Sequence, residues 1–308
     1  MIKNIPNHSD FEKIGIQCLC KAFEIIFQVG DRYLEKQDYI PKLEEDISIT
    51  EFWESHIISI NTSLILSFQG LESLMKMEVS KESPLLLIEN SKEDWPTTPN
   101  KRNKDFNELN SISGEKLLNV FFSVNKNEKI NKDFVNFYTE FRILRNKMIH
   151  GVGNDNINPK TSLFNILKSF EYFKGNYSWI YYIKEFFINE PIFGIDDYSY
   201  EFSKFYRVLN FTEFVLGKAT LNKFIEINIK ARRYFCPNCT TELKKYEIAE
   251  KSKWSFLVPN TSDSTKLSCL ICSKEYEVKR KNCEMEDCKG NVISNDSGNI
   301  CLTCFDEE

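Results

Sequence analysis

The sequence predicts a mainly α-helical bundle followed by small cysteine-rich β modules. Apolar residues recur at helical spacing through most of the first 230 residues. Glycine is scarce, at 11 of 308 residues, so turn signals are few. Eight of the ten cysteines follow residue 235, where short alternating segments replace the helical pattern. We therefore expect a helical domain over residues 1–230, a module over 231–281 and a second module over 282–308.

Composition places the chain among packed globular proteins. Apolar residues make up 42% and charged residues 28%, which excludes wholesale disorder. The first residues lack the basic-then-apolar order of a signal peptide, and no apolar run approaches the length needed to span a bilayer. We expect a soluble, cytoplasmic protein with no membrane partner.

Helices are predicted in order along the first 230 residues. The first contains CLCKAFEIIFQVGDRYL, the second covers residues 52–77 and the third residues 132–150. Three more contain SLFNILKSFEYF, SWIYYIKEFFI and the long segment that begins SYEFSKFYRVL. Residues 90–114, between the second and third helices, are polar and rich in Asn, Pro and Ser, which predicts a long loop or insertion.

The late cysteines form four pairs, in CPNC, CLIC, CEMEDC and CLTC. Without a secretion signal, such pairs favour zinc over disulfides or redox-active thiols. Two pairs together supply the four sulfur ligands of a tetrahedral Zn²⁺ site and leave no position open for water, so we predict two structural zinc ions and no catalytic metal. The simplest ligand sets are sequential, although interleaved sets also fit: Cys236, Cys239, Cys269 and Cys272, then Cys283, Cys288, Cys301 and Cys304. Cys18 and Cys20, in an apolar stretch, are most simply buried small residues.

The two modules differ in pattern and in charge. KWSFLVPN and KEYEVKRK predict short strands, and FCPNC with CLICSKEYEV resembles a zinc ribbon. Residues 231–281 hold eleven Lys or Arg against six Asp or Glu, whereas residues 282–308 hold one against seven. The first module could therefore contact nucleic-acid phosphates, and a merely solvated basic face is an equal alternative. We expect the acidic module to face solvent or a protein partner rather than nucleic acid. The basic residues are Arg232, Arg233, Lys244, Lys245, Lys279, Arg280 and Lys281, and the first four are the candidate contacts.

One charged residue lies within the apolar face of the helix over residues 132–150. At about 100° per residue, six side chains share the core face of this helix. Arg145 falls inside that stripe, where an unpaired charge is costly, so it requires a carboxylate, a phosphate or a water-filled cleft. Glu72 of the second helix is the best candidate for a purely structural ion pair. The stripe consists of Phe134, Phe137, Tyr138, Phe141, Leu144 and Met148.

The opposite face of the same helix carries polar groups near its end. Asn146 and His150 are four residues apart and lie beside Ile143, a face that a second copy of the chain could cover. Gly151 predicts that the helix ends there. The alternative for His150 is a purely structural role as a cap on the end of its own helix, where the helix dipole favours a protonated ring.

At these residues the sequence resembles the HEPN superfamily. The segment LRNKMIHG, with Arg145, Asn146, His150 and Gly151, is similar to the Arg-polar-x3-His signature of HEPN domains. The earlier segment ILSFQGLESLMKM resembles the helix that pairs with this motif in Apea-like and abortive-infection HEPN proteins. The two segments imply a HEPN fold for the helical domain.

The resemblance implies cleavage of RNA without a metal, in a bacterial defence or toxin system. HEPN ribonucleases usually dimerise, with two motif helices facing each other across a cleft. A substrate 2′-OH attacks the neighbouring phosphate, so RNA is cleaved and DNA is not. His150 would transfer protons, Arg145 would stabilise the phosphate charge, and Asn146 would orient either group.

The resemblance has one departure and leaves two alternatives. Many HEPN toxins controlled by a nucleotidyltransferase antitoxin carry Tyr two residues after the motif histidine, where this chain has Val152. That mode of control therefore has no support in these residues. A non-catalytic HEPN scaffold that binds nucleic acid, or a zinc-stabilised protein-interaction regulator, also fits the observations.

Overall fold

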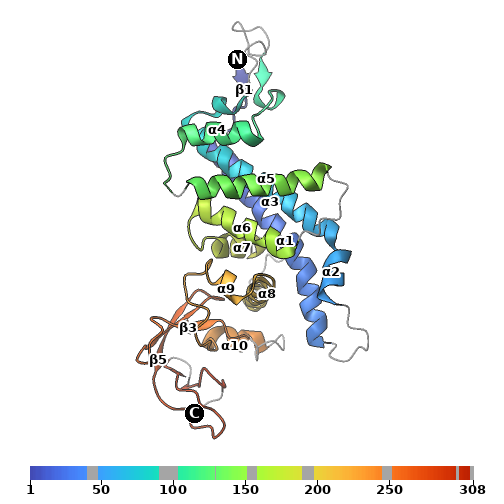
Figure 1. The fold of residues 1–308 in the computed structure, drawn as a ribbon. Coiled ribbons are helices and arrows are strands. Elements are labelled where there is room, and N and C mark those ends of the chain that lie inside the picture. Colours follow the sequence, from blue (N-terminus) through green and yellow to red (C-terminus); the bar gives the residue numbers. More distant parts are fainter. Residues whose placement is uncertain are drawn as a thin grey trace. The chain divides into compact units, whose positions relative to one another are not determined.

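The computed structural model confirms the predicted fold class: mainly helical, with a small C-terminal sheet region (Figure 1). It describes residues 1–39, 48–89, 103–128, 130–150, 158–188, 198–244, 252–295 and 298–305. The chain divides into two compact units, Met1–Tyr182 and Ile183–Glu308. The domain limits expected at residues 230 and 281 remain predictions. Among the described helices, none is both long and apolar enough to cross a membrane.

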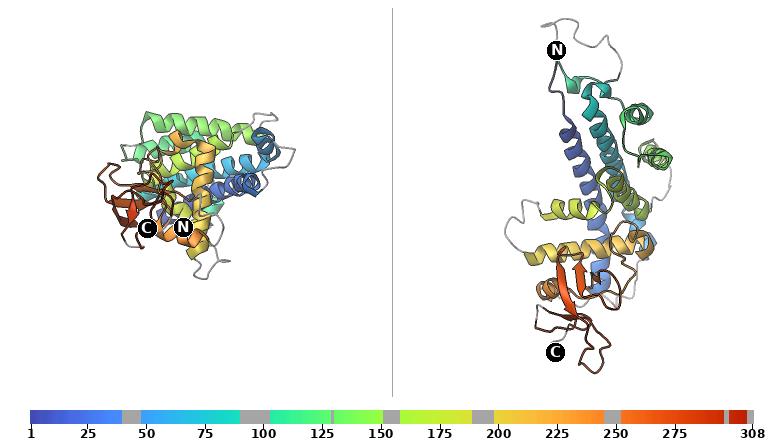
Figure 2. Two further views of the ribbon diagram at one scale, coloured as in Figure 1. Left: turned by 90° about the horizontal axis from the view of Figure 1, so that it is seen from below. Right: turned by 90° about the vertical axis from the view of Figure 1, so that its left-hand side faces the viewer.

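The first unit is built around two long helices. α1 (His8–Tyr39) and α3 (Ile57–Glu82) run side by side, and the shorter α5 (Lys132–His150) crosses α3 (Figures 1 and 2). A parallel pair of two-residue strands joins the first residues to residues 104–105, which fall within the predicted loop. The other elements are β1 (Ile2–Lys3), α2 (Ile49–Ser55), η1 (Pro84–Leu87), β2 (Lys104–Asp105), η3 (Phe106–Glu108), α4 (Gly114–Val124), α6 (Pro159–Lys174) and α7 (Trp179–Ile188), which reaches into the second unit.

Two glycines allow α1 and α3 to approach closely. A Cβ atom added at Gly70 would lie 3.0 Å from the carbonyl oxygen of Gly15 and 3.0 Å from Cγ of Leu19. One added at Gly15 would lie 2.8 Å from the Leu74 side chain. A side chain at either position would therefore require its neighbours to shift, and at Gly70 one of these neighbours is the backbone of α1. The pair therefore sets the distance between α1 and α3.

The predicted core stripe of α5 is confirmed. Phe134, Tyr138 and Phe141 are fully buried, and Phe137, Leu144 and Met148 pack against the same core. The ring of Phe68, on α3, lies 5.5 Å from the Tyr138 ring and 5.2 Å from the Phe141 ring. Aromatic contacts of this kind add to the free energy gained by burial. They hold the motif helix against α3.

Three local features differ from the sequence-based expectations. The helix predicted over 52–77 breaks at His56, whose φ of −111° and ψ of 19° separate α2 from α3 and whose Nδ1 lies 2.9 Å from the Phe52 carbonyl oxygen. The helix α4 has no counterpart among the predicted elements. Of the expected loop at 90–114, residues 90–102 lie outside the described residues. The remainder contributes Phe106, Leu109 and Ile112 to the core, because apolar side chains are spaced through a polar stretch.

The second unit joins helices to a small antiparallel sheet. α8 (Tyr198–Leu216) ends at Gly217, whose φ of 77° suits glycine, and α9 (Lys218–Leu221) follows. The strands lie in the order β3-β4-β5-β6, with Ser255 opposite Cys269 and Val278 opposite Ser294. The sequence pattern predicts β3 and β5 and misses β4. The remaining elements are α10 (Pro237–Leu243), β3 (Ser255–Leu257), β4 (Lys266–Cys269), β5 (Glu275–Lys279) and β6 (Ile293–Ser294).

A larger residue at Gly70 should destabilise the first unit. We expect Gly70→Leu to lower the free energy of unfolding by about 1–3 kcal/mol, because overpacking outweighs the better helix propensity of leucine. Gln69→Leu, at the neighbouring exposed position of α3, is the matched control and should have little effect. Chemical denaturation of both variants measures the difference. Equal stability would show that α1 and α3 do not need the close approach.

Candidate metal centres and the Arg145–His150 motif

The eight late cysteines gather into two clusters of four. Each cluster joins two consecutive pairs, so the geometry matches the sequential ligand sets: Cys236, Cys239, Cys269 and Cys272, then Cys283, Cys288, Cys301 and Cys304. Within each cluster the Sγ atoms all lie within 4.8 Å of one another. The pairs Cys236–Cys272, Cys239–Cys269, Cys283–Cys304 and Cys288–Cys301 are each 3.8 Å apart. A tetrahedral site with metal–sulfur bonds of about 2.3 Å has sulfur–sulfur edges of about 3.8 Å, so both clusters could hold a structural metal ion.

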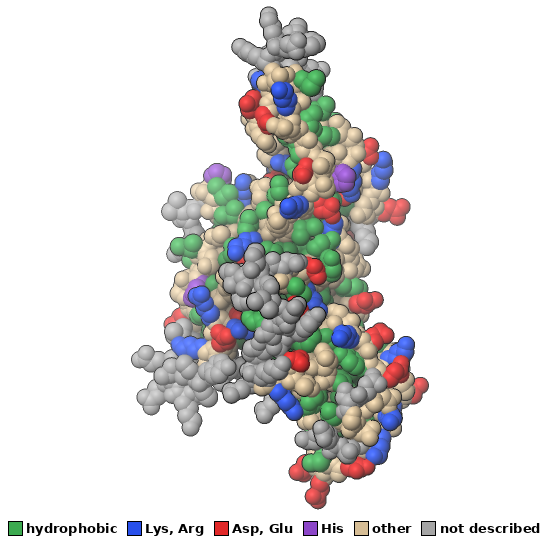
Figure 3. Space-filling view, turned by 180° about the vertical axis from the view of Figure 1, so that it is seen from behind, with side chains coloured by type: hydrophobic (Ala, Val, Ile, Leu, Met, Phe, Trp, Pro, Cys, Tyr) green, Lys and Arg blue, Asp and Glu red, His purple; other side chains and the backbone are tan. Residues whose placement is uncertain are grey.

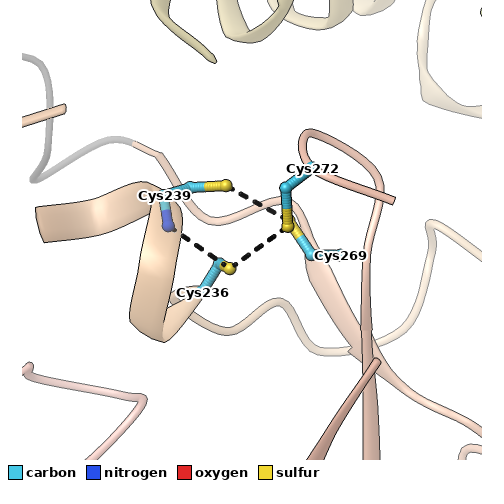
Figure 4. Close-up of side chains that lie close together, drawn as sticks. All are labelled: Cys236, Cys239, Cys269 and Cys272. Carbon is cyan, nitrogen blue, oxygen red and sulfur yellow. Dashed lines mark hydrogen bonds between the residues drawn. The ribbon is translucent and has the colours of Figure 1, made fainter. Parts of the chain in front are cut away.

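Local sequence explains how the first cluster forms. Cys236 is the N-cap of α10 and Pro237 occupies its first turn (Figure 4). The helix therefore begins within CPNC, the first of the four cysteine pairs, each of which forms a turn called here a knuckle. The Cys236 sulfur accepts a hydrogen bond from the Cys239 backbone N–H at 3.5 Å. The Tyr276 hydroxyl lies 3.4 Å from the Cys272 sulfur. Such contacts orient ligand sulfurs and offset part of their negative charge.

The second cluster depends on a glycine. The Cys288 sulfur accepts a hydrogen bond from the Gly290 N–H at 3.3 Å. A Cβ atom added at Gly290 would lie 2.7 Å from Cβ of Thr303 and 2.8 Å from the Cys301 sulfur. Only glycine therefore fits where the two knuckles meet. No local pattern in the sequence singles out this residue.

Of the two N-terminal cysteines, Cys20 is buried in the helical core, as expected, whereas Cys18 is only partly buried. Cys20 is 1% exposed, and burial raises the pKa of its thiol to about 12. Burial also raises the pKa of the half-buried Cys18. Thiols held in the protonated form are poor nucleophiles and poor metal ligands.

Arg145 lies at the edge of the aromatic core, partly buried. Its guanidinium carbon is 5.8 Å from the centroid of the Phe68 ring, and its Nη1 donates to Oδ1 of Asn146 at 2.9 Å. Among the described residues, no carboxylate forms an ion pair with Arg145. The guanidinium is therefore held by an aromatic ring and by an amide, and its charge is not neutralised by either.

Glu72, the expected structural partner of Arg145, is used elsewhere. Its Oε1 accepts hydrogen bonds from the Tyr138 hydroxyl at 3.1 Å and from the Gly114 N–H at 3.0 Å. The same hydroxyl lies 2.9 Å from the Gly114 carbonyl oxygen. Burial and the Glu72 carboxylate raise the pKa of Tyr138, so its hydroxyl remains a donor. This network ties α3, α4 and α5 together, and the sequence alone links neither Tyr138 nor Gly114 to Glu72.

The remaining motif residues are exposed at the end of α5. Asn146 and His150 both face solvent, as does Ile143, which is 49% exposed. Gly151 and Val152 lie outside the described residues. A cavity of about 250 Å³ lies elsewhere in the first unit, lined by α1, α3 and the segment around Phe106, with no lining residue from α5. The motif is thus an open surface feature.

The candidate nucleic-acid contacts of the second unit have different surroundings. Arg233 pairs with Glu213 of α8 at 2.5 Å and stacks 4.1 Å from the Trp254 ring centroid, so it has a structural role. Arg232 and Lys244 are exposed, and Lys245 lies outside the described residues. Acidic and basic side chains are intermingled over this unit on the face shown in Figure 3.

Comparison of the chain with models of protein families, with curated proteins and with solved structures finds no match.

Replacing Gly290 should remove one metal site and spare the other. We expect Gly290→Val to lower the bound metal from two ions per chain to one, because the added side chain would displace Thr303 or the Cys301 sulfur. Lys289→Val, at the exposed neighbouring position, should retain two. Elemental analysis of the purified full chain measures both. Two ions in the Gly290 variant would show that the close approach is dispensable.

Proposed function

We propose that this chain is an RNA endonuclease of the HEPN type that cleaves by attack of the substrate 2′-OH, with Arg145, Asn146 and His150 as its site. The observation that carries the proposal is the state of Arg145. A guanidinium at the edge of an aromatic core, without a carboxylate among the described residues, is available to an anion that arrives from outside. The resemblance to HEPN ribonucleases adds the setting of bacterial defence or toxin activity.

The chemistry of the three side chains suits phosphodiester cleavage. Arg145 supplies a planar, permanently charged donor for the negative charge that develops on the phosphate. His150, exposed at the end of α5, supplies the imidazole that exchanges protons near neutral pH. Asn146 already accepts a hydrogen bond from Arg145 and so limits the directions in which the guanidinium points. In the proposed site, the half-buried arginine would stabilise the phosphate while the exposed histidine exchanges the proton.

The exposed face of α5 supports a composite site formed by two copies. At about 100° per residue, Arg142, Ile143, Asn146, Ile149 and His150 occupy one arc of this helix. Ile143 is 49% exposed and Ile149 is 43% exposed, beside the polar motif residues. A second copy placed over this arc would bury both isoleucines and bring two motifs together. We therefore propose a homodimer through α5.

We propose that the two four-cysteine clusters hold Zn²⁺. Thiolates in tetrahedral sets of four favour zinc, and a set with four protein ligands leaves no coordination site for a substrate. The zinc ions would stabilise the small modules rather than take part in cleavage. Reduced thiols and an RNA substrate are both consistent with a cytoplasmic protein.

A second candidate is a non-catalytic regulator that binds nucleic acid. It is favoured by Arg232 and Lys244, exposed cations in the module that resembles a zinc ribbon. The acidic second module would then be the site for a protein partner. A chain that binds RNA with strong salt dependence and leaves it intact would favour this candidate.

Removing either motif side chain should abolish cleavage while the fold persists. We expect His150→Ala to slow cleavage of total RNA by about 100- to 10,000-fold, the usual contribution of a general acid or base. Arg145→Ala should cost about 100- to 1,000-fold, because charge on the phosphate loses its donor. Lys132→Ala, which removes an exposed charge at the other end of α5, is the control and should cleave normally. If wild type and both motif variants cleave equally, or none cleaves, the proposed site is wrong.

A charge on the exposed arc of α5 should separate the dimer. We expect Ile143→Asp to give a monomer in sedimentation velocity at micromolar concentration and to lose cleavage, because burying an unpaired carboxylate at the interface is unfavourable. Ile58→Asp, at a residue of α3 that is 79% exposed, should leave the dimer intact. A monomeric wild-type chain would contradict the composite site.

A further inference from the structure

The cavity of the first unit combines an apolar wall with one cationic side chain. It has a volume of about 250 Å³ and is lined by α1, by α3 and by residues 106–111. Leu87, Phe106 and Leu109 form its inner wall, and each of them is at most 9% exposed. Ile14 of α1 also lines it and is 48% exposed. The cavity is therefore apolar inside and open to solvent.

Lys76 of α3 is the cation in this cavity. The side chain is only partly exposed, and its Nζ donates to the Ser111 hydroxyl at 3.3 Å. Among the described residues, no carboxylate forms an ion pair with it. Burial lowers the pKa of Lys76, and Glu72, one turn earlier on α3, acts in the opposite direction. The Glu72 carboxylate is already hydrogen-bonded to Tyr138 and Gly114. The partly desolvated ammonium thus has a neutral hydroxyl as its acceptor.

The other polar groups of the cavity limit the charge of a ligand. Asp10 lines it but is exposed, and its Oδ2 accepts a hydrogen bond from the Asn7 backbone N–H at 2.8 Å. Asn107 and Ser111, the remaining polar residues of the lining, are neutral, and Lys76 is the only Lys or Arg in it. A single cation with an aspartate nearby favours an anion with one negative charge over a phosphate with two.

We propose that this cavity binds a small monocarboxylate with an apolar body. The carboxylate would accept a charge-assisted hydrogen bond from Lys76. It would also accept one from Ser111, because the serine oxygen accepts from Lys76 and its own hydroxyl proton is left to donate. The apolar body would be buried against Phe106 and Leu109.

The size of the cavity sets the size of this ligand. Pockets for drug-sized molecules begin at about 300 Å³, so a volume of about 250 Å³ suits a molecule of about ten non-hydrogen atoms. No residue of α5 lines the cavity. The inference is therefore independent of RNA cleavage by the Arg145–His150 motif, and a chain that binds the acid without cleaving RNA would refute the nuclease alone.

The test titrates the full-length chain with phenylacetate in isothermal titration calorimetry. We expect a Kd of about 1 mM or tighter, as is usual for a ligand of about ten non-hydrogen atoms. Phenylacetamide keeps the ring without the charge, and acetate keeps the charge without the ring. Both should bind at least about 10-fold more weakly.

Three outcomes of this titration would overturn the proposal. No binding of phenylacetate at about 10 mM, ten times the expected Kd, would exclude the site. Equal affinity for phenylacetamide would show that Lys76 does not select the ligand. Tighter binding of 2-phenylethylamine than of phenylacetate would show that Asp10 selects a cation instead.

A matched pair of lysine variants locates the carboxylate. Lys76→Met removes the ammonium and keeps the length of the side chain, so it should weaken phenylacetate binding by about 10- to 100-fold. It should leave the weak binding of phenylacetamide nearly unchanged. Lys81→Met, at an exposed position of the same helix, is the control and should bind phenylacetate as the wild type does. An equal effect of the two substitutions would overturn the assignment of Lys76.

A second pair leaves Lys76 in place and decides the question if Lys76→Met does not fold. Ile14→Trp puts a larger side chain on the open wall of the cavity and should block phenylacetate. Ile58→Trp, at a residue of α3 that is 79% exposed and does not line the cavity, should bind normally. Wild-type affinity in Ile14→Trp would place the ligand elsewhere and overturn the proposal.

Discussion

The buried carboxylate of Glu72 determines how the helices of the first unit meet. It is 7% exposed, and its Oε1 accepts hydrogen bonds from Tyr138 on α5 and from the Gly114 N–H at the start of α4. A buried charge is tolerated only when such donors replace its lost hydration, so both elements must come to α3 at this level. The close approach at Gly15 and Gly70 supports the same helix from its other side. α3 is thus held between α1 and α5, and the motif helix cannot slide along it without leaving Glu72 unsatisfied.

This constraint also sets the environment of Arg145. Glu72 already accepts a hydrogen bond from Tyr138, which lies two turns before Arg145 on α5. Among the described residues, the Arg145 guanidinium therefore contacts the Phe68 ring and Asn146 and not a carboxylate. An ion pair with Glu72 would have made Arg145 a structural residue. The same cation over an aromatic face keeps its charge available at a surface that Asn146 and His150 share. The core therefore positions the arginine, and among the described residues no carboxylate neutralises its charge.

The sequence predicted the parts of this structure that depend on local pattern. Helical periodicity located the stripe from Phe134 to Met148, and the paired cysteines located both clusters, because spacing alone determines which side chains share a face or a knuckle. It missed the break at His56, the register of Glu72 with Tyr138 and the need for glycine at position 290. The last two depend on atoms from segments distant in sequence, as when Thr303 fills the space beside Gly290, whereas the break at His56 involves a local contact with the Phe52 carbonyl oxygen. A single sequence holds no signal for such contacts.

The two four-cysteine clusters have the same ligands in different surroundings. Around the first, Trp254 donates to Asn210 of α8 at 2.8 Å, Arg233 pairs with Glu213, and Lys184 of α7 donates to the Ile271 carbonyl at 3.0 Å. A metal ion bound at the first cluster would stabilise a segment that packs against these helices, so removing it would also weaken the folding of the second unit. The second cluster is tied to the core of the same unit. Leu302, between its ligands Cys301 and Cys304, is fully buried and packs in one core cluster with Tyr234 and Val278. A metal ion at either cluster would therefore stabilise packed core structure in addition to its own ligands.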